Sequence, residues 1–167
     1  MMAVLVLDKR KKPLMPCSEK RARKLLKAKR ARIHQIIPFT IRIVDRTLDD
    51  CTLQPIEIKL DPGSKNTGIA LVRENKNRDI ATGEISNTVH VINLFELRHR
   101  GRQISESLTA RRQMRRRRRG NLRYRAPRFL NRTKPKGWLA PSLQHRVDTT
   151  QNWVNRLQHL SPVTAVV

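Results

Sequence analysis

The chain has 167 residues, of which 37 are Lys or Arg and only 13 are Asp or Glu, so its formal net charge is +24. This excess of positive charge requires an anionic partner. A membrane surface would call for an amphipathic helix with bulky aromatic side chains on one face, but only three Phe, two Trp and one Tyr are present, so nucleic acid is the better candidate. No apolar run approaches the roughly 18 residues of a membrane span, and we expect no membrane association. Cys17 and Cys51 are too few for a disulfide framework or a zinc site, and we interpret both as reduced thiols.

Residues 1–46 are predicted to form a small α+β unit. The apolar run at residues 3–7 indicates a short strand, and Ser18 is expected to cap a basic helix that extends to about Lys29. Residues 33–44 contain apolar side chains in alternation with polar ones. Because this period is that of a strand, the segment predicts one strand with a single buried face.

Residues 56–90 are predicted to form a β-meander, which a linker or turn at residues 45–55 joins to the first unit. The strand at residues 56–61 ends in an acid, Asp61. A glycine-containing turn and a second apolar strand follow it, as in a hairpin. A third strand is expected at residues 78–86, and it completes the meander.

Residues 91–120 are predicted to form one long helix, because apolar side chains recur there at spacings of three and four. A rod of this length would extend roughly 40 Å, so we expect it to project from the core or bridge it. The last ten residues of this predicted helix are the first part of an arginine-rich segment, residues 111–132, in which eleven of twenty-two residues are Arg. Since guanidinium groups bind phosphates bidentately and stack on bases, this segment predicts a nucleic-acid-binding surface.

Residues 121–141 are predicted to form an extended basic arm. Three aromatic side chains in it are candidates for base stacking, with packing as the alternative role; they are Tyr124, Phe129 and Trp138. Residues 142–167 are predicted to contain a helix from Ser142 to about Leu160 and then a hydrophobic strand that begins at Val163. We expect this strand to continue in a longer protein, so that the chain is a truncated form.

Five segments resemble the motifs of one nuclease family. Residues 60–68, Leu-Asp-Pro-Gly-Ser-Lys-Asn-Thr-Gly, are similar to the first motif of RuvC-type nucleases, and residues 12–17 resemble a Pro-Leu-Met-Pro motif. Residues 115–119 satisfy an R-R-x-R-R signature, and residues 124–129 and 136–143 resemble the segments that follow it. In this order the motifs resemble the IscB family of transposon-encoded RNA-guided DNA endonucleases, and they cover essentially the whole chain.

The resemblance implies an α/β, ribonuclease H-like fold of RuvC type, here a partial sheet preceded by a small PLMP domain (residues 1–46) and followed by an arginine-rich bridge helix. It implies that Asp61 is a catalytic residue and a ligand of Mg²⁺. Guide RNA and target DNA are the implied partners. The arginines that would contact nucleic acid are Arg111, Arg112, Arg115, Arg116, Arg118, Arg119, Arg123, Arg125 and Arg128.

The family carries its second catalytic carboxylate, an HNH domain and a later His and Asp beyond the segment that this chain matches. We therefore expect the chain to bind RNA without cutting DNA, and to act with a complementary C-terminal nuclease polypeptide if one is present. The remaining acids lack a distinctive spacing and are expected to lie on the surface; they are Glu57, Glu84, Glu96 and Glu106. The alternatives are a Holliday-junction-type RuvC-like nuclease and a non-catalytic, ribosomal-protein-like RNA-binding protein. The expected location is cytoplasmic, with nucleoid association on DNA.

Overall fold

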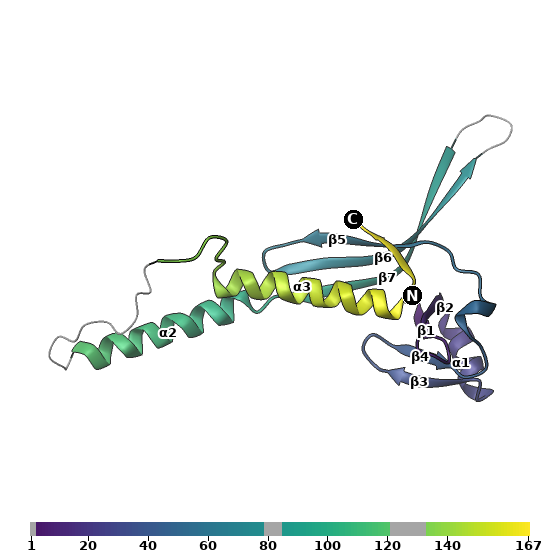
Figure 1. The fold of residues 1–167 in the computed structure, drawn as a ribbon, viewed down its shortest axis with the longest axis horizontal. Helices are drawn as coiled ribbons and strands as arrows, with labels where there is room; N and C mark the ends of the chain where they lie inside the picture. The colour runs from purple at the N-terminus through teal and green to yellow at the C-terminus, as the bar shows by residue number, and fades with distance from the viewer. Residues whose placement is uncertain (1–2, 79–84, 121–132) are drawn as a thin grey trace.

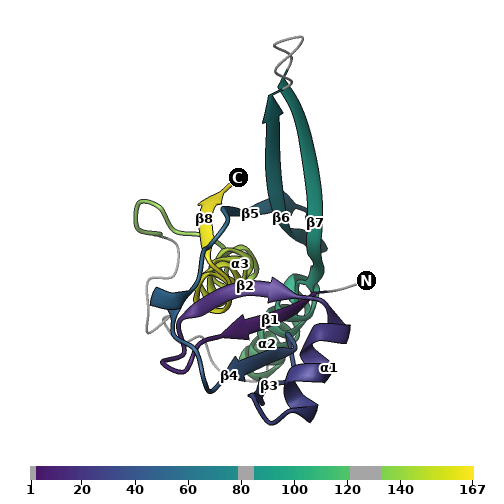
Figure 2. The same cartoon turned by 90° about the vertical axis from the view of Figure 1, so that its right-hand side faces the viewer.

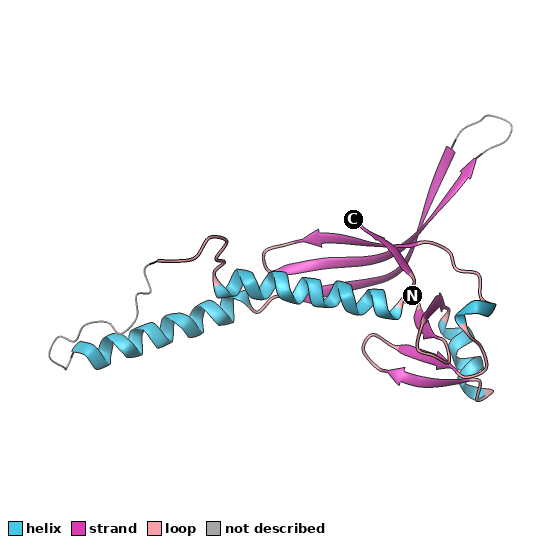
Figure 3. Cartoon of the chain, viewed as in Figure 1, coloured by secondary structure: helices cyan, strands magenta, loops and turns pink. Residues whose placement is uncertain are grey.

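The computed structural model describes residues 3–78, 85–120 and 133–167. These residues form two four-stranded sheets and three α-helices (Figures 1 and 3). The first sheet has the order β2-β1-β4-β3, with β1 and β4 parallel and the other pairs antiparallel. Its strands are β1 (Val4–Leu7), β2 (Pro13–Cys17), β3 (Ala31–Gln35) and β4 (Thr40–Ile43), and α1 (Glu19–Lys27) packs on it.

The second sheet has the order β7-β6-β5-β8, in which only β5 and β8 are parallel. Its strands are β5 (Ile56–Pro62), β6 (Asn66–Arg78), β7 (Ile85–Arg98) and β8 (Val163–Val166). The helices α2 (Gly101–Gly120) and α3 (Pro141–Leu160) follow β7, and a single 3-10 turn (Leu48–Asp50) lies in the connection between the two sheets. The β-meander, the strand at residues 3–7 and the last strand are therefore confirmed.

One hydrophobic core joins the two sheets through the C-terminal half of α3. Leu157 is fully buried against Ile56 and Ile58 of β5, and Leu5 and Leu7 of β1 belong to the same cluster. Alternation along β5 produces this arrangement, because even-numbered residues face α3 while odd-numbered ones face the opposite side. Figure 2 shows α3 between the second sheet and the first.

The helix expected from Ser18 is confirmed at its start. Ser18 is the N-cap residue, and its hydroxyl accepts a hydrogen bond from the Arg21 amide at 3.4 Å. The helix ends at Lys27 rather than Lys29, because Lys29 adopts a left-handed backbone conformation with φ of 56°. The Lys29 and Arg30 amides donate to carbonyls of the last helical turn, which closes the C-terminus.

The strand predicted at residues 33–44 is confirmed for Thr40–Ile43, which is β4, but the chain reverses before it, so the earlier residues belong to a separate antiparallel strand, β3. The alternation of apolar and polar residues in this segment also does not predict which side chains are buried. Thr40 and Ile41 are adjacent and both fully buried, since β4 is an inner strand with the core of α1 on one face and a polar contact to Pro38 on the other. Because both faces of β4 are covered at these positions, its burial pattern does not alternate.

The predicted helix of residues 91–120 is wrong in its first ten positions. Residues up to Arg98 form β7, and α2 begins only at Gly101. The strand at residues 78–86 is likewise misplaced, because β6 extends to Arg78 and β7 begins at Ile85. Phe95 and Leu97 are partly buried and alternate with the exposed Leu94 and Glu96, which is a strand period that the leucine spacing obscures.

Pairing with β6 makes Ile85–Arg98 a strand rather than part of a helix. The ladder between the two strands provides backbone hydrogen bonds that a helix would have to replace. The final helix also begins one residue earlier than predicted. Ala140 is the N-cap and Pro141 is the first helical residue, where the missing amide of proline costs no hydrogen bond. Ser142 is therefore inside the helix and does not cap it.

Candidate nucleic-acid interface

The described part of the arginine-rich segment is the C-terminal half of α2. All of its arginine side chains are exposed, and the helix continues beyond the end of the second sheet (Figure 1). The two partly buried residues of α2, Gly101 and Ile104, lie in its first turn, and a Cβ atom added to Gly101 would lie 3.8 Å from Ser142 on α3. The prediction of a helix that projects from the core is therefore confirmed, for a helix of about 30 Å rather than 40 Å.

The arginines surround the helix on every side. Consecutive helical residues are separated by about 100°, so five adjacent side chains leave no face of the helix without a cation. An apolar face that could pack on the sheet is absent from residues 109–120, apart from the exposed Met114. The second half of α2 therefore has no apolar face with which to pack on the rest of the described chain.

No acid within residues 3–78, 85–120 and 133–167 forms an ion pair with these arginines. The single ion pair on α2 joins Arg102 and Glu106, at 2.7 Å, before the arginine run begins. The uncompensated side chains are Arg111, Arg112, Arg115, Arg116, Arg117, Arg118 and Arg119. Their mutual repulsion favours binding of an external polyanion, and their position near the helix C-terminus is compatible with the helix dipole.

Several predicted contact residues lie outside the described residues, namely Arg123, Arg125, Arg128, Tyr124 and Phe129. Trp138 is described, and its side chain is 43% exposed. The ammonium group of Lys134 lies 3.6 Å from the centre of its ring. This cation–π contact covers one face of the indole and holds the ring at the surface.

Asp61 lies at the end of β5 with its side chain on the sheet face opposite to α3. It is exposed, and its carboxylate has no hydrogen bond or ion pair to any described residue. Its cross-strand partner is Gly68 on β6, and a Cβ atom added to this glycine would lie 3.5 Å from the Asp61 Cβ atom. The glycine therefore leaves the carboxylate open from the side of β6.

The other acids do not complete a metal site around Asp61. No group of three His, Cys, Asp or Glu side chains suited to a metal ion occurs in the described part of the chain. Glu96 of β7 is on the same face, but β6 separates it from β5, so the two backbones are about 10 Å apart. Asn66 donates to the Glu96 carboxylate at 2.6 Å, and Glu57 lies 4.0 Å from the Lys59 ammonium.

A polar cluster that the sequence did not indicate lies at the start of α2. The buried hydroxyl of Thr67 is 2.7 Å from the Nε2 atom of His99, and the His99 amide donates to the Lys65 carbonyl. Burial lowers the pKa of His99, and the neighbouring Arg146 and His145 lower it further. These contacts link the turn after Asp61 to the first residues before α2, so the acid and the arginine helix share one rigid base.

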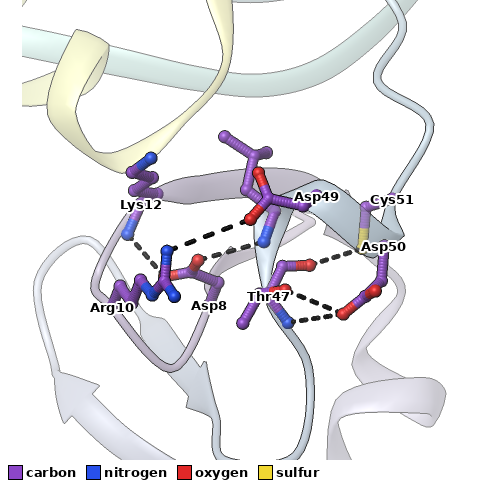
Figure 4. A network of polar contacts seen from close by, with 8 residues as sticks. Asp8, Arg10, Lys12, Thr47, Asp49, Asp50 and Cys51 are labelled. Atoms are coloured by element: carbon purple, nitrogen blue, oxygen red, sulfur yellow. Dashed lines mark hydrogen bonds and ion pairs between the residues drawn. The ribbon is translucent and has the colours of Figure 1, made fainter.

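A second acid, Asp8, is fully buried but has a structural role (Figure 4). Its two carboxylate oxygens accept hydrogen bonds from the amides of Lys12, at 2.7 Å, and Leu48, at 3.1 Å. Arg10 contacts Asp49 instead, at 3.9 Å. Asp8 therefore joins the turn after β1 to the connection between the sheets, with no acceptor atom facing a cavity.

Both cysteines are free thiols, as predicted. Burial raises the pKa of the Cys17 thiol, although the nearby Arg21 acts in the opposite direction. The thiol is therefore less reactive than an exposed one. Within the described residues, no helix has the length and apolar character needed to cross a membrane.

Fold and surface define a basic α/β protein with two mixed sheets and a projecting helix of uncompensated arginines. The family model of the RRXRR protein matches residues 4–167. The chain therefore belongs to the RRXRR family, the domain associated with IscB. Comparison with curated proteins gives no match.

Proposed function

We propose that this chain is the guide-RNA-binding N-terminal part of an IscB-like RNA-guided DNA endonuclease and does not cleave DNA by itself. Membership of the RRXRR family supports a nucleic-acid-associated role. In this proposal α2 is the bridge helix, and its arginines contact the phosphates of the guide RNA. The target DNA and a complementary nuclease polypeptide are the further partners, and the setting is the cytoplasm or nucleoid.

The observation that carries the proposal is the set of uncompensated arginines on the outer half of α2. Contacts within the described chain account for none of their charge, whereas a nucleic acid backbone would satisfy all of them. Arginine also presents a planar fork to phosphate oxygens, so a rigid helix of arginines fixes the position of a backbone and not only its proximity.

The second sheet supports the RuvC-like part of the proposal. It contains an antiparallel meander of three strands, with a fourth strand parallel to the first and a helix on one face. Because parallel strands end at the same edge, the Val167 carbonyl accepts a hydrogen bond from Leu60, immediately before Asp61. Residues that follow this strand in a longer chain would therefore lie beside Asp61.

Asp61 fits one ligand of Mg²⁺, because its carboxylate is exposed and has no partner in the described chain. The described residues do not supply the other ligands that two-ion hydrolysis of a phosphodiester requires. When bound, the metal would activate water and stabilise the leaving oxygen in the intact nuclease. This chain's own contribution is to hold one carboxylate rigidly at the end of β5.

The proposal is tested by titrating the chain into a labelled, structured RNA. Simultaneous replacement of Arg115, Arg116, Arg118 and Arg119 by Ala should weaken binding by at least tenfold, because it removes bidentate phosphate contacts. The matched control replaces three lysines at or near the end of α1 and should weaken binding much less; these are Lys24, Lys27 and Lys29. Equal losses would indicate diffuse attraction to the whole charge and would contradict the assignment to α2.

A further inference from the structure

The tip of the β3–β4 hairpin presents two adjacent isoleucines to solvent. Ile36 is 76% exposed and Ile37 is 72% exposed, and no other large apolar side chain among the described residues exceeds either value. Ile33 of the same hairpin is also exposed. Adjacent exposed apolar side chains on a protein of this charge indicate a contact surface, because exposure of a group of apolar side chains to water is unfavourable.

The tip is held rigidly although it is exposed. The Gln35 side-chain amide donates to the carbonyls of Ile37 and Pro38, and the Thr40 hydroxyl donates to the Pro38 carbonyl at 2.9 Å. Arg156 of α3 donates to the Ile37 carbonyl at 2.8 Å. Since the backbone is fixed from both β4 and α3, the isoleucines keep their outward position in the free protein.

Cations lie on the hairpin that carries this apolar tip, toward its open end, and a further cation contacts the tip itself. Arg32 of β3 lies directly opposite Arg42 of β4 in the antiparallel register, an arrangement of like charges that destabilises a hairpin unless an anion offsets it. Arg156 lies beside the tip. An apolar groove of about 550 Å³ lies between the tip and α1, and its one acid, Glu19, is already paired with Arg23 at 3.3 Å.

The hairpin also has a defined position relative to α2. In Figures 1 and 2 the β3–β4 hairpin and α2 lie on the same side of α3, and the tip is directed along α3 toward α2. The contacts that anchor them, at Arg156 and Ser142, are separated by 14 residues of α3, or about 21 Å. The arginine run at residues 115–119 lies a further 14 to 18 residues along α2, or about 21 to 27 Å, beyond Gly101.

We propose that Ile36 and Ile37 form a wedge that inserts between stacked bases of the nucleic acid whose phosphates α2 binds. This inference rests on the proposed nucleic-acid binding and adds a second contact to it. Apolar side chains of this kind enter base steps and partly unstack them, while nearby cations hold the adjacent phosphates. Arg156 beside the tip and Arg32 and Arg42 further along the hairpin form no ion pair with a described acid, and their charge favours this occupant over a protein segment, which would leave it uncompensated.

The test uses the full chain with an RNA hairpin and a DNA duplex of about 20 base pairs, each carrying 2-aminopurine at one position per sample. The fluorescence of this base rises when it is unstacked. We expect a rise at one or two neighbouring positions, outside the stretch of phosphates that α2 protects. The helix that shows the rise, RNA or DNA, identifies the substrate of the wedge.

Replacement of Ile36 and Ile37 by Ala should abolish the fluorescence rise and weaken binding by about tenfold, with the salt dependence unchanged. Ile33→Ala is the matched control and should leave the rise intact, because Ile33 is exposed but lies on β3 away from the tip. Ile37→Leu should preserve the rise, since leucine retains the wedge. Thermal melting of each variant shows whether the fold is intact.

Binding with its full salt dependence but no fluorescence change at any position would overturn the wedge and leave the proposed function standing. Absence of salt-dependent binding would instead contradict the proposed function itself. If the two Ala substitutions dissociate a dimer of the chain and alter no fluorescence signal, the tip contacts a second copy of the chain and the wedge is excluded.

Discussion

Asp61 on β5 lies directly opposite Gly68 on β6, and the glycine exposes the carboxylate at the end of its strand. Glycine within a strand lowers stability, because it gains no side-chain packing and loses more backbone entropy on folding. A Cβ atom at this position would make an ordinary contact with the Asp61 Cβ atom, at 3.5 Å. The glycine is therefore explained by access to Asp61 and not by lack of space.

Gly68→Ala should stabilise the protein by about 0.5 kcal/mol, because alanine restricts the unfolded chain and the native position accepts its methyl group. Urea unfolding monitored by circular dichroism measures this change. Gly63 provides the contrast, because a Cβ atom there would lie 2.2 Å from the Asn66 carbonyl oxygen. Gly63→Ala should destabilise the protein, and stabilisation by both substitutions would contradict the geometry of this hairpin.

Asp61→Asn should leave RNA affinity within about twofold, because its exposed carboxylate contacts no basic residue of α2 and removal of one negative charge has a small effect. The wild-type chain should show no cleavage of labelled single-stranded, duplex or branched DNA with Mg²⁺ or Mn²⁺, since one carboxylate does not hold two ions. Cleavage that Asp61→Asn abolishes would contradict the proposal of an incomplete site.

The affinity of the chain for RNA should fall steeply with salt. If the arginine segment engages about 6 to 10 phosphates, the logarithm of the association constant should decrease with the logarithm of salt concentration with a slope of about −5 to −9. The variant that lacks Arg115, Arg116, Arg118 and Arg119 should lose about 3 units of this slope. Fluorescence anisotropy at several salt concentrations measures both slopes, and a flat dependence would exclude an electrostatic interface.

Asp8→Ala should reduce the free energy of unfolding by about 2 kcal/mol, because it removes a fully buried carboxylate and leaves the amides of Lys12 and Leu48 without their acceptor. Asp8→Asn retains one carbonyl oxygen and should cost less. Asp49→Ala is the matched control on the same network, and its exposed side chain should contribute little. A loss for Asp49→Ala as large as for Asp8→Ala would contradict the assigned role.

His99 should make the stability depend on pH below its ordinary pKa of 6.5. Because folding lowers the pKa, the folded protein binds fewer protons than the unfolded chain. The stability from a neutral His99 is thus present above pH 6.5 and is lost as the pH falls through the folded pKa. Unfolding free energies near neutral pH and at about pH 5 should differ less for His99→Gln than for wild type. His159→Gln, at an exposed position of α3, should behave as wild type.

Local sequence was sufficient for several elements of the fold. The cap at Ser18, the apolar run of β1 and the strand that ends at Asp61 are set by neighbouring residues, and the structure contains all three. The extent of β7 could not be obtained in this way. Leu94 and Leu97 pair with Ala70 and Thr67 of β6, which are 24 and 30 positions away in sequence, and this ladder overrides their helical spacing.

The composition by itself determined that this protein carries basic side chains without acidic partners, because no fold of 167 residues could pair 37 basic side chains with 13 acidic ones. Only the tertiary structure determined which of the described basic side chains have no acidic partner and where they lie on the protein. The outer half of α2 leaves the core because its arginines cannot be buried, whereas the Ile36–Ile37 tip is exposed because β3 and β4 reverse at that point. A chain reversal fixed by contacts with α3 is a long-range property, so local periodicity did not reveal it.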